Sequence, residues 1–177
     1  MQPTPPRWTR WTATTSVLCG CLLLVLAGGF GPLLTYVTAH AGMTVVPSAL
    51  GVPLGLPGLR AVPLGDTTWP WQLAEDFGAL TLLAVAVLRM RRHVRLRPEG
   101  GRGRRLLAGW TALIAGAAVA GAWRGLVAAR MVEASVPGWL GYAVAGALFG
   151  ALWGAVLGWI PGAGAAFSAP RAAGTAH

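Results

Sequence analysis

The sequence predicts an all-α, polytopic membrane protein: a four-transmembrane-helix bundle with both termini on the cytoplasmic side. The first supporting observation is composition, because 55 % of the 177 residues are hydrophobic and only 11 % are charged, well outside the range of an ordinary soluble domain. The second is a set of four apolar segments, each close to the roughly 20 residues that cross a bilayer. The third is the placement of the arginines, which gather on one side of the predicted membrane.

The first predicted span covers residues 15–38 and follows a cytoplasmic tail of residues 1–14, which contains Arg7 and Arg10. The tripeptide AHA at residues 39–41 also matches a signal-peptidase site. The apolar stretch before it is longer than a usual signal core. Removal of residues 1–41 as a signal peptide nevertheless stays open.

Residues 39–69 form a connection that is apolar but interrupted by proline. Its prolines are Pro47, Pro53, Pro57 and Pro63. Proline at this density prevents a regular helix, and backbone without hydrogen-bond partners cannot lie exposed in hydrocarbon. We expect this segment to cap the outer end of the bundle or to contact a partner or ligand. The second span then covers residues 70–89, with Pro70 in its first turn.

The third and fourth spans are predicted at residues 106–128 and 138–160, followed by a flexible cytoplasmic tail of residues 161–177. Only about nine residues connect these two spans, which is typical of antiparallel neighbours. Eight of the fourteen arginines fall between Arg89 and Arg105, around the connection at 90–105. The positive-inside rule therefore places this connection and both termini in the cytoplasm.

Small residues recur at helical spacing in the last two spans. The glycines concerned are Gly146, Gly150, Gly154 and Gly158 in the fourth span, and Gly116, Gly121 and Gly125 in the third. In lipid, small residues allow the backbones of two helices to approach closely and so drive helix association. We expect the two small-residue faces to pack on each other within one chain. A homo-oligomeric interface, or one with another membrane protein, is the alternative.

Charged residues fall inside the second and third spans at similar predicted depth. Glu75 and Asp76 lie about one turn below the outer end of the second span. Arg124 lies some 18 residues past Leu106, which is roughly 27 Å at 1.5 Å per residue. A charge within the membrane is costly unless it is paired. We hypothesise that Arg124 bonds Glu75 or Asp76; separate snorkelling to headgroups and a proton or ion relay are the alternatives.

The connection at 90–105 is predicted to be a solvated loop that meets anionic lipid headgroups. The arginines assigned to this contact are Arg91, Arg92, Arg95, Arg97, Arg104 and Arg105. Nucleic acid is not an expected partner, because no aromatic platform accompanies the charge.

The sequence shows no set of residues that could converge for catalysis. It contains no HExxH motif, cysteine cluster or nucleophile elbow. We therefore predict no catalytic residue, no metal and no cofactor. The preferred hypothesis is a small integral protein of the plasma (inner) membrane that acts non-enzymatically as an assembly or accessory subunit, in contact with lipid and with a second copy or another membrane protein. The alternative is a small transporter or channel that uses Glu75, Asp76 and Arg124.

Overall fold

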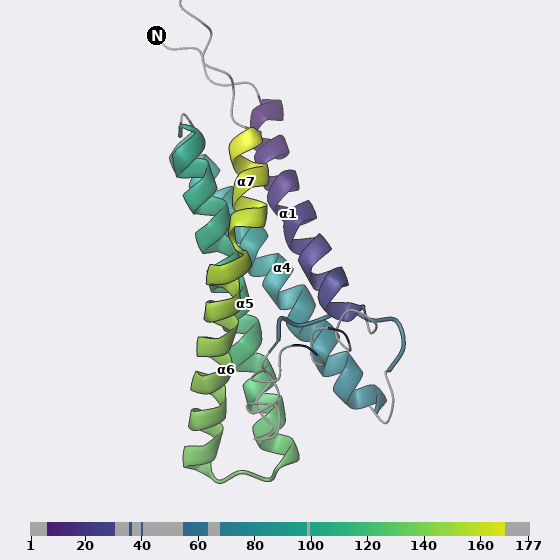
Figure 1. The fold of residues 1–177 in the computed structure, drawn as a ribbon. Helices are drawn as coiled ribbons and strands as arrows, with labels where there is room; N and C mark the ends of the chain where they lie inside the picture. Colours follow the sequence, from purple (N-terminus) through teal and green to yellow (C-terminus); the bar gives the residue numbers. More distant parts are fainter. Residues whose placement is uncertain are drawn as a thin grey trace, which may run out of the picture.

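The computed structural model describes residues 7–30, 36, 40, 55–63, 68–98 and 100–168. Within these residues the structure is helical, as the sequence predicts, and it contains five helices (Figure 1). They are α1 (Arg7–Gly29), α4 (Trp69–Leu96), α5 (Arg102–Met131), α6 (Val136–Leu157) and α7 (Trp159–Phe167).

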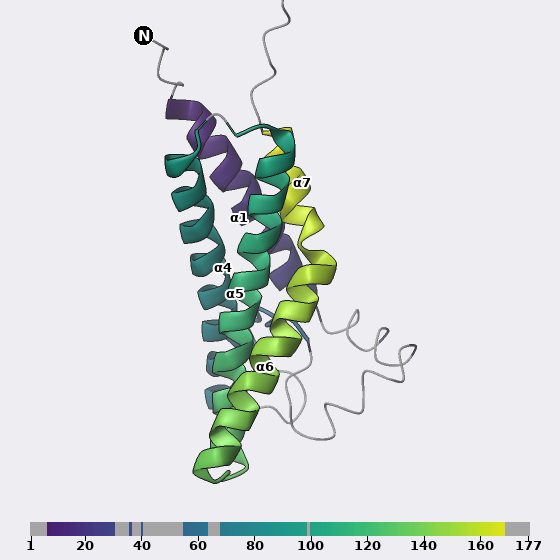
Figure 2. The same ribbon diagram turned by 90° about the vertical axis from the view of Figure 1, so that its left-hand side faces the viewer.

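Helix α5 occupies the centre of the bundle and contacts α4, α6 and α7, while α1 packs against α4 and α7. Helices α6 and α7 follow one another along α5, and α4, α5 and α6 lie side by side (Figure 2). The start of α1, the α4–α5 turn and the end of α7 therefore meet at one end of the molecule, which we call the arginine end (Figure 1). The α5–α6 turn lies at the opposite end, which we call the hairpin end.

Three of these helices are long and apolar enough to cross a membrane. They are the Thr12–Gly29 part of α1, α5 and α6. Helix α4 contains the predicted second span but is not among the three. Its charge-free stretch, Phe77–Leu88, is only twelve residues long and is flanked by acids before it and arginines after it.

Several element boundaries differ from the predicted ones. Helix α1 begins at Arg7, so part of the predicted tail at residues 1–14 is helical. The predicted first span runs beyond the end of α1 into residues that lie mostly outside the described ones. The predicted loop at 90–105 is also shorter, because α4 continues to Leu96 and α5 begins at Arg102.

The end of α4 has a local cause. Arginine is a good helix former, so the arginine-rich sequence continues the helix well beyond Arg89. Pro98 then disfavours the helical conformation for the residue before it. Arg97 accordingly has φ −138° and ψ 69° and ends the helix.

The carboxyl-terminal part of the chain is helical further than predicted. Pro161 has no N–H to donate to the carbonyl of Leu157, and a proline at such a position interrupts a helix. The helix breaks at Gly158 and resumes as α7, which extends to Phe167. Residues 161–167 of the predicted tail are therefore helical, and residues 169–177 lie outside the described ones.

Candidate functional site

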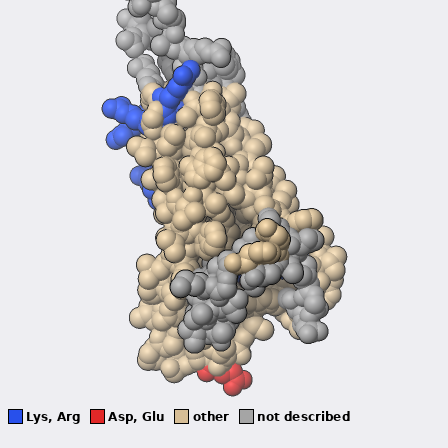
Figure 3. Space-filling model, viewed as in Figure 1, with Lys and Arg blue, Asp and Glu red and all other residues tan. Residues whose placement is uncertain are grey.

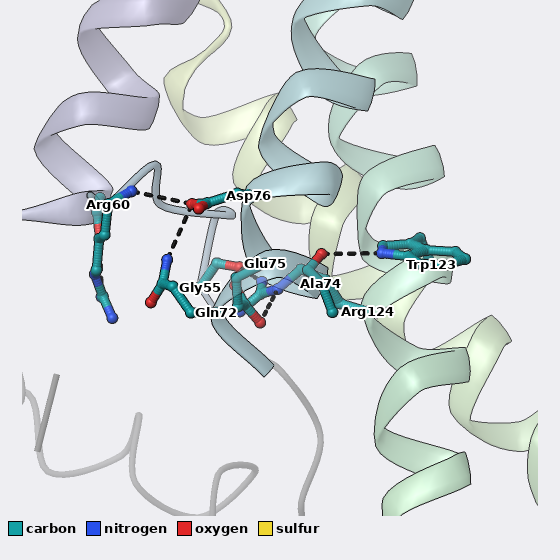
Figure 4. Close-up of polar contacts among 9 residues, drawn as sticks. Gly55, Arg60, Gln72, Ala74, Glu75, Asp76, Trp123 and Arg124 are labelled. Carbon is teal, nitrogen blue, oxygen red and sulfur yellow. Dashed lines mark hydrogen bonds and ion pairs between the residues drawn. The ribbon is translucent and has the colours of Figure 1, made fainter. Parts of the chain in front are cut away.

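An ion pair joins α4 to α5 (Figure 4). The Nε of Arg124 donates to Oε1 of Glu75 over 2.8 Å, and the two side chains are only 11 % and 14 % exposed, respectively. Of the two predicted carboxylate partners, Glu75 is the one that Arg124 contacts in the structure. The Nη1 of Arg124 also donates to the carbonyl of Gly55, so the same guanidinium contacts a third segment of the chain.

Asp76 has different partners from Glu75. Its Oδ1 accepts hydrogen bonds from Nε2 of Gln72, over 2.9 Å, and from the backbone N–H of Arg60, over 3.0 Å. The side chain of Gln72 is buried. Sequence reasoning missed Gln72, although its position four residues before Asp76 places both on one helical face.

Residues 55–63 lie across the end of α1. The guanidinium of Arg60 donates from Nε to the carbonyl of Gly29 over 3.0 Å and from Nη2 to that of Gly28 over 3.4 Å, and the N–H of Leu59 donates to the carbonyl of Val25 over 3.2 Å. These carbonyls belong to the last turns of a helix, where carbonyls lack partners within the helix and where cations are favoured.

The close approach of segment 55–63 to α1 depends on glycine. A Cβ placed on Gly58 would lie 2.6 Å from the carbonyl carbon of Gly28 and 2.7 Å from the nitrogen of Gly29. Segment 55–63 thus covers the end of α1; whether the connection as a whole caps the outer end of the bundle stays a prediction. Residues 41–54 and 64–67 of that connection lie outside the described residues.

Together these contacts form a polar cluster with balanced charge, two arginines against two carboxylates. It ties α1, segment 55–63, α4 and α5 together (Figure 4). The indole N–H of Trp123 adds a bond to the carbonyl of Ala74 over 3.0 Å. Both carboxylates already accept from donors of the chain itself, so the arrangement is suited to holding helices together.

Three glycines of α6, Gly146, Gly150 and Gly154, face α5. A Cβ on Gly146 would collide with the carbonyl oxygen of Gly121, and one on Gly150 with that of Ala117. A Cβ on Gly154 would lie 2.6 Å from the Cα of Ile114. The predicted packing of the two small-residue faces within one chain is therefore present. Gly158 differs, because it meets the indole of Trp110.

The glycines of α5 do not share one face, contrary to the prediction. Gly121 and Gly125 face α6, but a Cβ on Gly116 would lie 2.7 Å from the carbonyl oxygen of Leu82 in α4. At about 100° per residue, Gly116 points about 140° away from Gly121 around the helix axis. It therefore serves the α4 interface.

Arg105 departs from the predicted lipid contact. Its side chain is only 2 % exposed. Its guanidinium donates to three carbonyls, those of Pro98 (3.2 Å), Gly100 (3.1 Å) and Ser168 (3.2 Å). Arg105 therefore joins the α4–α5 turn to the end of α7. The other predicted arginines, Arg91, Arg92, Arg95, Arg97 and Arg104, are exposed.

His93 lies beside this turn. Its Nε2 is buried and has no hydrogen-bond partner among the described residues. Burial, together with the charges of Arg97 and Arg105, lowers the pKa of His93 from its usual 6.5. Among the described residues no group of three or more His, Cys, Asp or Glu side chains could hold a metal ion. No family model, curated protein or solved structure matches this chain.

Proposed function

We propose that the chain is an integral protein of the plasma membrane with four spans, in which α4 is the fourth membrane-crossing helix. The observation that carries this proposal is the outward face of α4. Five large apolar side chains on it are each between 53 % and 63 % exposed: Trp69, Leu73, Phe77, Leu80 and Leu88. An apolar face of this length in water would be unfavourable, whereas lipid would cover it. The acids of α4 turn inward, so mean hydropathy understates how apolar its outer surface is.

We propose the orientation of the bundle from the charges at its two ends. On the face shown in Figure 3, arginine atoms appear only near the arginine end, and the acidic atoms appear at the opposite end. With the positive-inside rule, the arginine end faces the cytoplasm together with both termini.

Thiol labelling in intact cells tests this orientation. In a chain whose two native cysteines are replaced by alanine, a cysteine at Gly101 should be shielded from a membrane-impermeant reagent. A cysteine at the exposed Ser135 of the hairpin end should react. Labelling of Gly101→Cys but not Ser135→Cys would reverse the orientation, and labelling of both would argue against the span count.

We further propose a non-enzymatic role as an assembly or accessory subunit. Two features support it. The buried polar groups of α4 and α5 bond to each other and hold four segments of the chain in place. Gly146, Gly150 and Gly154 of α6 already pack against α5. A partner would therefore contact the outward faces, where Leu148 and Leu152 are well exposed.

The test is to extract the tagged protein gently from its native membrane and to weigh the intact complex by native mass spectrometry. One foreign protein in fixed stoichiometry is the expected result. Leu148→Ala should weaken its retention, whereas Gly150→Leu should disrupt the fold itself and serves as the control for unfolding. A monomer or a homo-oligomer alone would count against the accessory role.

The alternative function is transport through the site at Glu75, Asp76 and Arg124. This alternative is suggested by the low exposure of Glu75 and Arg124, because charged groups within membrane helices mark ion and proton pathways. Glu75→Gln or Asp76→Asn should then abolish flux into proteoliposomes while the protein still assembles. If flux is unchanged, or if it falls only because the protein no longer assembles, the transport function is excluded and the cluster has a structural role.

A further inference from the structure

Helix α4 carries a dense row of cations beyond its apolar part. It stays helical for seven residues past Arg89, a length of about 10 Å. Arg89, Arg91, Arg92 and Arg95 are all exposed there. Like charges three or four residues apart on a helix repel each other. The described carboxylates, at Glu75, Asp76 and Glu133, belong to the start of α4 and to the hairpin end, so none of them lies beside Arg92 or Arg95.

The second feature of this region is that exposed leucines alternate with the arginines. Leu88, Arg92 and Leu96 are four residues apart and share one helical face, and the two leucines are 63 % and 70 % exposed. At the start of α5, the exposed Arg104 is followed one turn later by Leu107, which is 57 % exposed. Apolar surface thus continues past the arginines on α4, whereas on the antiparallel α5 it begins one turn after Arg104, on the membrane side.

This alternation discriminates between two sources of anion. A soluble phosphate would leave Leu96 exposed to water and would gain nothing from it. A phospholipid offers a phosphate to the guanidinium group and hydrocarbon to the leucine. Arginine suits such a contact, because its fork of N–H groups matches phosphate oxygens and its stem can lie along apolar surface.

We propose that Leu88, Arg92, Arg95, Leu96, Arg104 and Leu107, here called the Arg/Leu surface, bind the phosphate headgroups of anionic phospholipids. The inference rests on the proposed membrane embedding. It narrows the predicted lipid contact, because Arg105 bonds to protein carbonyls and takes no part. Arg92 and Arg95 have no hydrogen-bond or ion-pair partner among the described residues, so their donors are available to lipid.

Binding of defined lipids to the purified full-length protein tests the proposal. Native mass spectrometry in detergent gives the apparent dissociation constants of phosphatidylglycerol and phosphatidylcholine with identical acyl chains. The wild-type protein should prefer phosphatidylglycerol. Arg92→Gln and Arg104→Gln should each weaken phosphatidylglycerol binding about fivefold, and the double variant about 25-fold, since a basic residue at an anionic surface contributes about 1 kcal/mol. Binding of phosphatidylcholine should not change.

Two further variants sharpen the outcome. Arg130→Gln removes an exposed arginine near the hairpin end and should leave the tight phosphatidylglycerol site intact. Leu96→Asn should weaken phosphatidylglycerol binding, and inorganic phosphate at matched ionic strength should not compete. Equal affinity for both lipids would overturn the proposal. Competition by inorganic phosphate with no effect of Leu96→Asn would assign a soluble anion instead. Either result leaves the thiol labelling of the spans untouched, so membrane embedding is judged separately.

Discussion

Replacing Glu75 by glutamine removes one charge from the pair between α4 and α5. The variant keeps the size of the side chain but loses the charge-assisted bond to Arg124, a bond that is worth about 1.5–3 kcal/mol. Breaking a fully buried pair costs about 3–5 kcal/mol because one charge is left alone. Here Arg124 keeps its bond to the Gly55 carbonyl and retains slight exposure. We therefore expect a loss of about 2–3 kcal/mol in the free energy of unfolding.

The informative measurement is a double-mutant cycle with Arg124→Gln. Unfolding in mixed micelles, followed by tryptophan fluorescence, gives the free energy of each variant. The double variant should be nearly as stable as either single one, so the coupling energy should be about 2–3 kcal/mol, close to the cost of one single change. Arg130→Gln, at an exposed position, is the control and should change stability by less than about 0.5 kcal/mol. Single effects that add within about 0.5 kcal/mol would refute the pairing as a source of stability.

Charge reversal asks whether the interaction can be rebuilt in the opposite sense. Arg124→Glu alone should reduce accumulation of the protein, because it places three carboxylates near one another. Adding Glu75→Arg should restore part of the loss. Full recovery is not expected, since a glutamate at position 124 cannot donate to the carbonyl of Gly55. No recovery at all would show that the Gly55 contact, and not the ion pair, dominates.

Three further outcomes follow from the structure. Gly146→Ala should lower the free energy of unfolding by about 1–3 kcal/mol, the usual cost of overpacking. Gly141→Ala is the control and should be neutral or slightly stabilising, because a Cβ at Gly141 meets open space. Equal effects of the two changes would contradict close packing at Gly146. Because burial lowers the pKa of His93 from 6.5, the unfolded chain binds that proton more tightly. Stability should be full above this pH and should decline as the pH falls below it, and a pH titration of unfolding should show that His93→Gln removes the decline. Residues 7–29 should remain in the mature protein, because α1 forms part of the core and accepts the bonds of segment 55–63; an intact mass that begins at residue 42 would disprove this.

The sequence predicted the depth of charged residues well because helix geometry converts residue number into distance. Counting from the start of each span placed Glu75 and Arg124 at the same level, and the two do form a pair. The same reasoning could not choose between Glu75 and Asp76. They are adjacent residues, so they point in directions about 100° apart, and the choice depends on how α4 is rotated.

Segment 55–63 was harder to predict, because most of its contacts involve main-chain atoms. Arg60 donates to the carbonyls of Gly28 and Gly29, and its own N–H donates to Asp76. Glycine has no side chain, so the residue types at these two positions give no sign that their carbonyls need a donor. The one available signal was that Arg60 is the only arginine in a largely apolar connection, which indicates a specific partner.

The glycines of α5 were also hard to assign from the sequence, because spacing alone does not tell which neighbouring helix each glycine contacts. A stripe of residues four apart turns by about 40° at each step, because a helix has 3.6 residues per turn. Small residues along such a stripe therefore pass from one neighbour to another. Gly121 meets α6 and Gly116 meets α4, while Gly109 approaches Gly162 of α7. Glycines that point in several directions around the helix axis thus indicate a helix with neighbours on several sides. In a membrane bundle, such a pattern predicts that the helix lies at the centre.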